Sequence, residues 1–68
     1  MEGLKKPLFA ELEAELRRNG MTRKEYGKQI GLSASGISAR LNGKIEFSLS
    51  EMLKTKKLLN KSLDDLFD

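Results

Sequence analysis

The sequence predicts an all-α fold, a compact bundle of five short helices that forms a single domain over residues 1–68. Helix start signals alternate with glycine and asparagine stop signals, and apolar residues recur at helical spacing. No stretch of four or more residues alternates in polarity as a half-buried β-strand does. From these observations we expect helices at about residues 7–19, 22–30, 33–41, 48–59 and 62–67.

The first expected helix starts near Pro7, because proline suits a first turn, where its missing N–H leaves no intrahelical bond unmade. The helix stops at Gly20, which can adopt a positive φ and follows a basic last turn that complements the helix dipole. Its apolar residues are spaced as a single stripe, which we expect to face the core: Leu8, Phe9, Leu12 and Leu16.

The second and third expected helices meet at a tight turn. Thr22 and Glu25 match the capping box that opens a helix, and Gly31 marks the end of that helix. Ser33 is an N-cap candidate for the third helix, and Gly43 follows the end of that helix. The apolar residues expected to face inward from the two helices and the turn are Tyr26, Ile30, Leu32, Ile37 and Leu41.

The fourth expected helix opens with a second capping box, formed by Ser48 and Glu51, and ends before Asn60. A weaker version of the box, with aspartate in the glutamate position, starts the fifth helix at Ser62. We expect most apolar residues of this part of the chain to lie in the core, and the last three of them either close that core or provide a dimer contact. These residues are Phe47, Leu49, Met52, Leu53, Leu59, Leu63, Leu66 and Phe67.

The composition excludes several classes of function. The chain has no cysteine and no histidine, so disulfides, thiolate or imidazole metal sites, cysteine nucleophiles and histidine bases are excluded. The sequence contains no glycine-rich phosphate loop, no constellation of metal ligands and no apolar run long enough to span a bilayer. We therefore expect a cytoplasmic binding protein rather than an enzyme, with no cofactor, metal, membrane or small-molecule ligand.

The positive charge is concentrated in the middle of the chain. Thirteen Lys and Arg residues stand against ten Asp and Glu residues, which gives a net charge of +3. The whole excess lies within residues 21–50, while residues 1–20 and 51–68 are each neutral. A basic centre is typical of a surface that faces a polyanion, although a merely solvated face would show the same pattern.

The sharpest motif is the spacing Tyr26-Gly27-x-x-Ile30-Gly31-Leu32-x-x-x-x-Ile37. Two short helices that cross steeply need a tiny residue at the crossing, a glycine in the turn and apolar residues that face inward. Gly27 meets the first need, which explains a glycine that costs about 1 kcal/mol relative to alanine inside a helix. Gly31 meets the second need. The spacing therefore predicts a helix-turn-helix, and a plain αα-corner in a bundle is the alternative.

These residues resemble the helix-turn-helix of phage repressors and Cro proteins, the lambda-repressor-like family. Residues 31–43 are similar to the recognition helix of that family and the turn after it, and Leu41-Asn42-Gly43-Lys44 with Phe47 is similar to small prophage regulators. The resemblance covers about residues 9–67. It implies a Cro-like, sequence-specific transcription regulator that binds a double-stranded DNA operator through helix 33–41 in the major groove.

The resemblance also implies how such a protein would work. Operators in this family are roughly palindromic, so we expect a homodimer, at least when the protein is bound to DNA. Regulation would be repression, by occupation of an operator at the nucleoid of a bacterial or phage-infected cell. The alternative is a small helical adaptor that binds protein, such as an anti-repressor or an antitoxin-like partner. In that case another polypeptide would cover the face that carries Ser35 and Ala39.

The resemblance assigns roles residue by residue. The residues expected at base edges are Ala34, Ser35, Gly36, Ser38 and Ala39. The residues expected at phosphates are Arg23, Lys24, Ser33, Arg40, Asn42 and Lys44. Ser35 matches a serine that hydrogen-bonds a base, and Ala39 matches an alanine that packs on a thymine methyl group.

Three positions differ from the usual residue of the family. Ala34 replaces a polar residue that reads adenine in relatives, so specificity is expected to depend on methyl groups and on DNA deformability. Arg23 stands where glutamine is usual, and its bidentate fork should hold a phosphate more strongly. Arg40 falls where an apolar core residue is usual, and its guanidinium either reaches the DNA or lies along the edge of the core.

Overall fold

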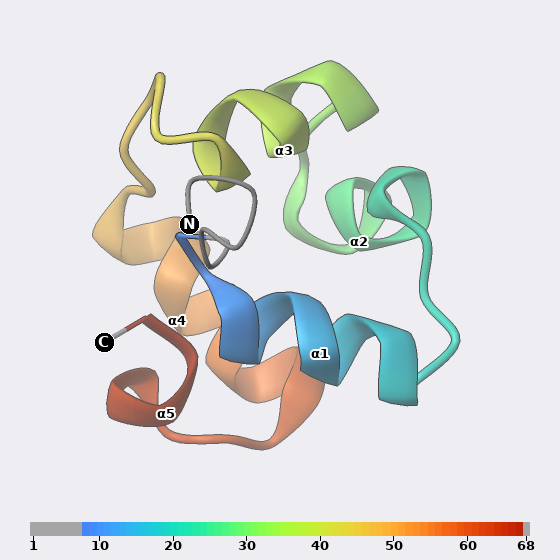
Figure 1. Ribbon diagram of the computed structural model, residues 1–68, viewed down its shortest axis with the longest axis vertical. Helices are drawn as coiled ribbons and strands as arrows, with labels where there is room; N and C mark the ends of the chain where they lie inside the picture. The colour runs from blue at the N-terminus through green and yellow to red at the C-terminus, as the bar shows by residue number, and fades with distance from the viewer. Residues whose placement is uncertain (1–7, 68) are drawn as a thin grey trace, which may run out of the picture.

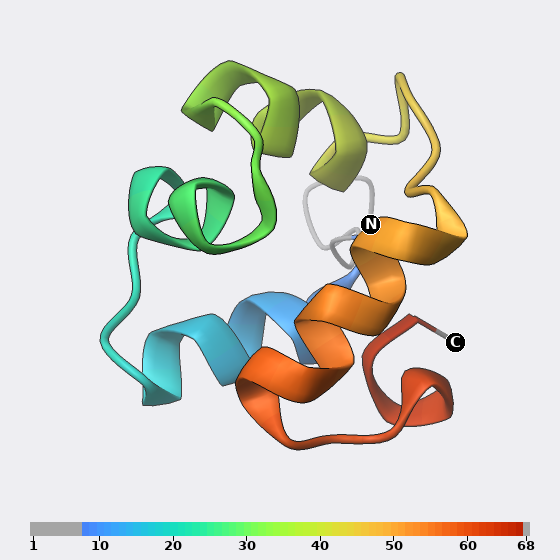
Figure 2. The same cartoon turned by 180° about the vertical axis from the view of Figure 1, so that it is seen from behind.

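The computed structural model describes residues 8–67, which form five α-helices and no strand (Figure 1). The prediction of an all-α fold with five short helices is confirmed. The helices are α1 (Ala10–Arg18), α2 (Arg23–Ile30), α3 (Ala34–Leu41), α4 (Leu49–Leu59) and α5 (Leu63–Phe67). Along the longest axis of the molecule, α3 lies at one end and α5 at the other, and the view from behind shows α4 crossing between them (Figure 2).

The ends of the helices follow the capping signals. In α2 the Glu25 amide donates to Thr22 Oγ1 (3.1 Å), and the Thr22 amide donates back to Glu25 Oε1 (2.8 Å). Ser48 and Glu51 make the same reciprocal pair at α4, with distances of 3.1 and 3.0 Å. Both predicted capping boxes are therefore confirmed. At α3, Ser33 Oγ accepts a hydrogen bond from the amide of the third helical residue (3.1 Å).

The first helix starts later than the sequence indicated. Pro7, the expected start, lies outside the described residues, and α1 begins at Ala10 after a non-helical Phe9. The ring of Phe9 packs edge-on against Phe47 (centroids 5.3 Å apart) and Phe67 (6.0 Å), and the last two rings are 5.0 Å apart. This aromatic cluster holds the approach to α1 against the start of α4 and the end of α5, which accounts for the later start.

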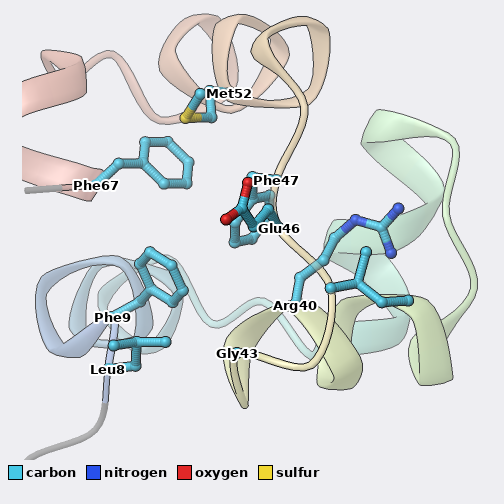
Figure 3. Close-up of a pocket in the computed structure, with 9 residues that line it drawn as sticks. Leu8, Phe9, Arg40, Gly43, Glu46, Phe47, Met52 and Phe67 are labelled. Carbon is cyan, nitrogen blue, oxygen red and sulfur yellow. The ribbon is translucent and has the colours of Figure 1, made fainter.

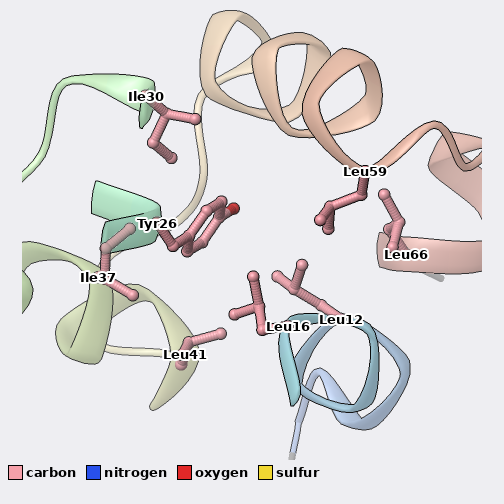
Figure 4. Packing of buried hydrophobic residues seen from close by; sticks show 8 residues of the cluster. All are labelled: Leu12, Leu16, Tyr26, Ile30, Ile37, Leu41, Leu59 and Leu66. Atoms are coloured by element: carbon pink, nitrogen blue, oxygen red, sulfur yellow. The ribbon is translucent and has the colours of Figure 1, made fainter. Parts of the chain in front are cut away.

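The core contains side chains from all five helices, gathered between α1, α2 and α4 (Figure 4). Each of its members is among the apolar residues predicted to face inward. The buried cluster consists of Leu12, Leu16, Tyr26, Ile30, Ile37, Leu41, Leu59 and Leu66. The C-terminal residues Leu66 and Phe67 therefore help to close the monomer core, and of the two roles considered for them the structure supports this one.

The prediction that most apolar residues of the first and fourth helices are core was wrong for three leucines. Leu8 remains 62% exposed, Leu49 63% and Leu53 44%. In α4 the inward face is formed by Thr55 and Leu59, which are buried, so Leu49 and Leu53 fall on the outward side of the helix.

A buried hydrogen-bond chain joins α2 to α4. Thr55 Oγ1 donates to the Glu51 carbonyl (2.8 Å) and lies 2.6 Å from the Tyr26 hydroxyl. Because Thr55 has a single hydroxyl proton, which goes to the carbonyl, the Tyr26 hydroxyl is the donor in the second bond. The chain satisfies both hydroxyls in the core and fixes α2 at one position along α4.

Candidate nucleic-acid interface

The turn between α2 and α3 is built around Gly27. A Cβ atom at this position would overlap the Leu32 carbonyl oxygen and lie 3.2 Å from Ile37 Cγ1. The Leu32 amide donates to the Gly27 carbonyl (2.7 Å), and Gly31 ends α2 with a φ of 85°, a conformation that favours glycine. The predicted roles of Gly27 and Gly31 are thus confirmed, and the two helices pack more closely than any side chain at residue 27 would permit.

This close packing fixes which side of α3 faces outward. Ile37 and Leu41 point into the core, so the opposite side of the helix is turned to solvent. Of the residues expected at base edges, Ala34 and Ser35 are exposed, while Gly36, Ser38 and Ala39 are half-buried. The exposed part is therefore the first turn of α3, together with Ser33 at its N-cap.

Two hydroxyls at this end of α3 are held by short-range contacts. Ser33 Oγ accepts the Gly36 amide and lies 3.1 Å from Ser35 Oγ. A hydroxyl has one proton and two lone pairs, so Ser35 keeps hydrogen-bonding capacity toward solvent after this contact. The first turn of α3 thus presents one polar group among small apolar ones.

Arg23 links three helices. From the first turn of α2 its Nη1 donates to Ser38 Oγ on α3 (3.0 Å), and its Nη2 lies 3.5 Å from Glu13 Oε1 on α1. The side chain is still 45% exposed, so the guanidinium lies at the surface beside α3. The sequence did not identify Glu13 as the partner of Arg23. The only indication was that the two side chains, ten residues apart, have opposite charges.

The remaining residues expected at phosphates lie at the start of α2 and at the end of α3. Lys24 is exposed beside Arg23 at the start of α2, where the helix dipole adds partial positive charge. Asn42 caps the end of α3, and Lys44 follows in the exposed loop before α4. We call the exposed area made by these elements the α2–α3 surface; it comprises Arg23, Lys24, Ser33, Ala34, Ser35, Asn42 and Lys44.

Glu25 is the acidic side chain nearest this basic area in sequence, and its carboxylate is engaged in the capping box. The hydrogen bond from the Thr22 amide lowers the pKa of Glu25 below its ordinary value, with a smaller contribution from the Thr22 hydroxyl. The carboxylate is thereby directed back at the helix terminus.

Arg40 belongs to the edge of the core. Its Nε donates to Glu51 Oε1 (2.8 Å), its Nη2 to Glu51 Oε2 (3.2 Å) and its Nη1 to the Gly36 carbonyl (3.0 Å). Only 14% of the Arg40 side chain and 16% of the Glu51 side chain are exposed. The hydrogen bonds from Arg40, followed by the bond from the Ser48 amide, lower the pKa of Glu51 below its ordinary value against the opposing effect of burial.

In the protein without DNA, the Arg40 guanidinium therefore lies along the edge of the core, which is one of the two positions considered from the sequence. Glu51, assigned from sequence only as a capping residue, is the ion-pair partner of Arg40, which the sequence did not indicate. The sequence pointed to this pair only through the opposite charges of the two side chains. Their separation of eleven positions along the chain gave no indication that they are close in space.

A mainly apolar pocket of about 390 Å³ lies close to Arg40 (Figure 3). It lies between the residues before α1, the loop after α3 and the end of α5, and the aromatic cluster lines it. Figure 3 shows the guanidinium of Arg40 directed away from Phe9 and Phe67. Residues 8–67 contain no group of three or more acidic side chains placed to hold a metal ion.

None of the five helices has the length and apolarity that a membrane crossing requires.

Comparison with known proteins gives one match. The sequence model of the helix-turn-helix family matches residues 12–66, which run from α1 to α5. No curated protein and no solved structure matches the chain. The match covers most of the sequence and includes the turn organised by Gly27 and Gly31. The chain therefore belongs to the helix-turn-helix family of the Cro and phage-repressor kind, whose members are DNA-binding transcription regulators.

Proposed function

We propose that this protein binds a specific DNA operator with α3 in the major groove and represses transcription by occupying that operator. The observation that carries the proposal is the exposure of the first turn of α3 on a helix whose other side is fixed in the core. In a helix-turn-helix the N-terminal part of the second helix is the part that meets base edges.

The chemistry of that turn supports recognition by small groups. Ser35 can donate a hydrogen bond to a base or accept one, and the methyl groups of Ala34 and Ala39 suit contact with thymine methyl groups. Gly36 is half-buried, and a Cβ there would meet Ser33 Oγ and Arg40 Nη1, so this position serves the packing of the turn more than the contact with DNA. With few bidentate donors available, part of the specificity is expected to come from the ease with which the operator deforms.

The proposed phosphate contacts surround this turn. Arg23 and Lys24 lie at the start of α2, Ser33 lies in the turn, and Asn42 and Lys44 lie beyond the end of α3. Arg23 can keep one nitrogen on Ser38 and exchange the longer contact to Glu13 for a phosphate oxygen. Arg40 is omitted from the proposed phosphate contacts, because each of its three nitrogens donates a hydrogen bond within the protein and only 14% of its side chain is exposed.

We further propose that two copies bind one operator, since a roughly palindromic site has two equivalent halves. Because Leu66 is buried in the monomer core and Phe67 packs against it, the contact between the copies would depend mainly on other residues. The alternative function is that of a small helical adaptor that binds protein, and the following experiment distinguishes the two functions.

The test is selection of bound sequences from a random duplex pool, followed by measurement of affinity between about 50 mM and about 200 mM salt. We expect an enriched motif with two half-sites about one helical turn apart, or a multiple of that distance, and a steep loss of affinity with salt. If no sequence is enriched and no duplex binds at low salt, the adaptor function is favoured instead.

A further inference from the structure

The two sides of α3 are attached to the protein in different ways. Toward α2 the attachment is close and mainly apolar, through Gly27, Leu32 and Ile37, and Arg23 adds one hydrogen bond to Ser38. Toward α4, α3 is followed by residues 42–46, which are all exposed and therefore give it little support. The ion pair between Arg40 and Glu51 spans this weak side, from the last turn of α3 to the first turn of α4.

The guanidinium also reaches the beginning of α3. Arg40 Nη1 donates to the carbonyl of Gly36, which lies in the exposed turn of the helix, while Nε and Nη2 hold the two oxygens of Glu51. A planar fork that binds both carboxylate oxygens fixes angle as well as distance. One side chain thus relates the first turn of α3 to the first turn of α4.

Glu51 is itself held firmly. Its Oε1 accepts the Ser48 amide (3.0 Å), and its carbonyl accepts the Thr55 hydroxyl that in turn meets Tyr26 of α2. The path Tyr26–Thr55–Glu51–Arg40–Gly36 therefore runs from α2 through α4 to α3. Since α2 and α3 also pack directly on each other, this path and that contact together connect α2, α4 and α3 in a closed ring.

We propose that Arg40 and Glu51 form a positioning pair that sets the orientation at which α3 meets the duplex, so that both residues control operator discrimination without touching DNA. The inference rests on the proposed function of α3. Half-buried ion pairs of this kind add little net stability, because desolvation offsets their attraction, but they favour one geometry over its alternatives.

The variants that test this pair are Arg40→Met, Arg40→Lys, Glu51→Gln and the double variant Arg40→Met/Glu51→Gln. Glutamine can replace glutamate in a capping box, so Glu51→Gln weakens the ion pair while keeping the cap of α4. Glu25→Gln is the matched control, because it makes the same exchange in the other capping box, where the described contacts include no arginine. For each protein we would measure affinity for the selected duplex and for a scrambled duplex over a range of salt concentrations.

The positioning role predicts that Arg40→Met and Glu51→Gln each lower the ratio of the two affinities by about tenfold, and that the double variant loses no more than either single one. Arg40→Lys should recover only part of the loss, because lysine keeps the charge and lacks the fork. Glu25→Gln should leave the ratio unchanged. Circular dichroism at the temperature of the binding assay would establish that every variant is folded.

Two results would overturn the inference while leaving the proposed function intact. If Arg40→Met reduces the salt slope by about 0.9 on both duplexes, Arg40→Lys restores it and Glu51→Gln has no effect, Arg40 is a phosphate ligand. If neither single variant changes the ratio, the pair has no part in discrimination.

The effect of Arg40 and Glu51 on α3 can also be measured on the free protein, without DNA. Amide chemical shifts of isotope-labelled protein should change at the first turn of α3 in both Arg40→Met and Glu51→Gln, and should stay in place there in Glu25→Gln. Unchanged α3 amides in Glu51→Gln would refute the positioning role even if the wild-type protein selected no operator.

Discussion

Gly27 shows how a single residue without a side chain determines the geometry of the interface. Glycine inside a helix costs about 1 kcal/mol relative to alanine, and here it is needed because a Cβ would overlap the backbone of Leu32. Backbone atoms cannot move aside as the end of a flexible side chain can. The angle between α2 and α3 therefore depends on the absence of one methyl group.

Gly27→Ala is expected to destabilise the protein by about 2–4 kcal/mol, since the added carbon must push the turn away from α2. Urea unfolding followed by circular dichroism measures this change. Gly20→Ala is the control, because Gly20 has a φ of 62° with open space around it and should cost only about 1 kcal/mol of backbone strain. Equal or greater stability of Gly27→Ala would contradict the close approach of the two helices.

Tyr26 offers a second test at this scale, because it is the only tyrosine of the chain and the chain has no tryptophan. Burial raises the pKa of Tyr26 from 10.0 to about 12, although its hydrogen bond with Thr55 acts in the opposite direction. Between these two pH values the unfolded chain has lost a proton that the folded protein retains, so the free energy of unfolding falls as the pH rises above 10.

Absorbance titration of tyrosinate, with circular dichroism on the same samples, measures this shift directly. We expect no ionisation while the protein stays folded below about pH 11, and a midpoint well above that of free tyrosine. An ordinary midpoint near 10 in a folded protein would show that the Tyr26 hydroxyl is accessible to solvent.

At the scale of the element, the helices are delimited by their own local chemistry. A hydroxyl and a glutamate three residues apart, or a glycine with a positive φ, act within one turn of the chain, so the sequence alone was sufficient to predict the starts and ends of α2 to α5. The start of α1 was not predictable in this way, because Phe9 is held by aromatic rings that are distant in sequence.

Ser48→Ala is expected to destabilise the protein by about 1 kcal/mol, because the amide of Glu51 loses its acceptor at the start of α4. Thermal unfolding provides the measurement. Ser50→Ala is the matched control, since Ser50 is an exposed hydroxyl in the first turn of the same helix, and its replacement should change stability by no more than about 0.5 kcal/mol. Equal effects of the two variants would remove the capping box from the account of α4.

At the scale of the whole molecule, two kinds of information were missing from the sequence. The outward direction of Leu49 and Leu53 depends on Thr55 taking a place in the core, which the apolar pattern of α4 does not reveal. The inward direction of Arg40 depends on a partner across a loop. The exposure of Ser35 was predictable because it follows from the turn, whereas the position of Arg40 was unpredictable because it depends on a contact between distant elements.

The charge of the folded molecule is distributed unevenly. The α2–α3 surface carries Arg23, Lys24 and Lys44, whereas Lys56 and Lys57 lie in the last turn of α4, away from α3 (Figure 2). If DNA binds the α2–α3 surface, counterions are released there, and the lysines of α4 contribute little to the salt dependence of DNA affinity.

Arg23→Ala is therefore expected to weaken binding to every duplex alike and to reduce the magnitude of the slope of log affinity against log salt by about 0.9. Lys57→Ala, the matched loss of one exposed positive charge, should leave that slope unchanged. Equal reductions in the two variants would indicate a diffuse electrostatic attraction without a defined docking surface.

Chemical-shift mapping would show whether the first turn of α3 enters the major groove. Isotope-labelled protein would be titrated with the selected duplex at a salt concentration that suppresses non-specific binding. We expect the largest amide shifts at residues 33–39 and at the start of α2, with the outward side of α4 unaffected. Shifts that centre on α4, or that leave residues 33–36 in place, would contradict the entry of α3 into the groove.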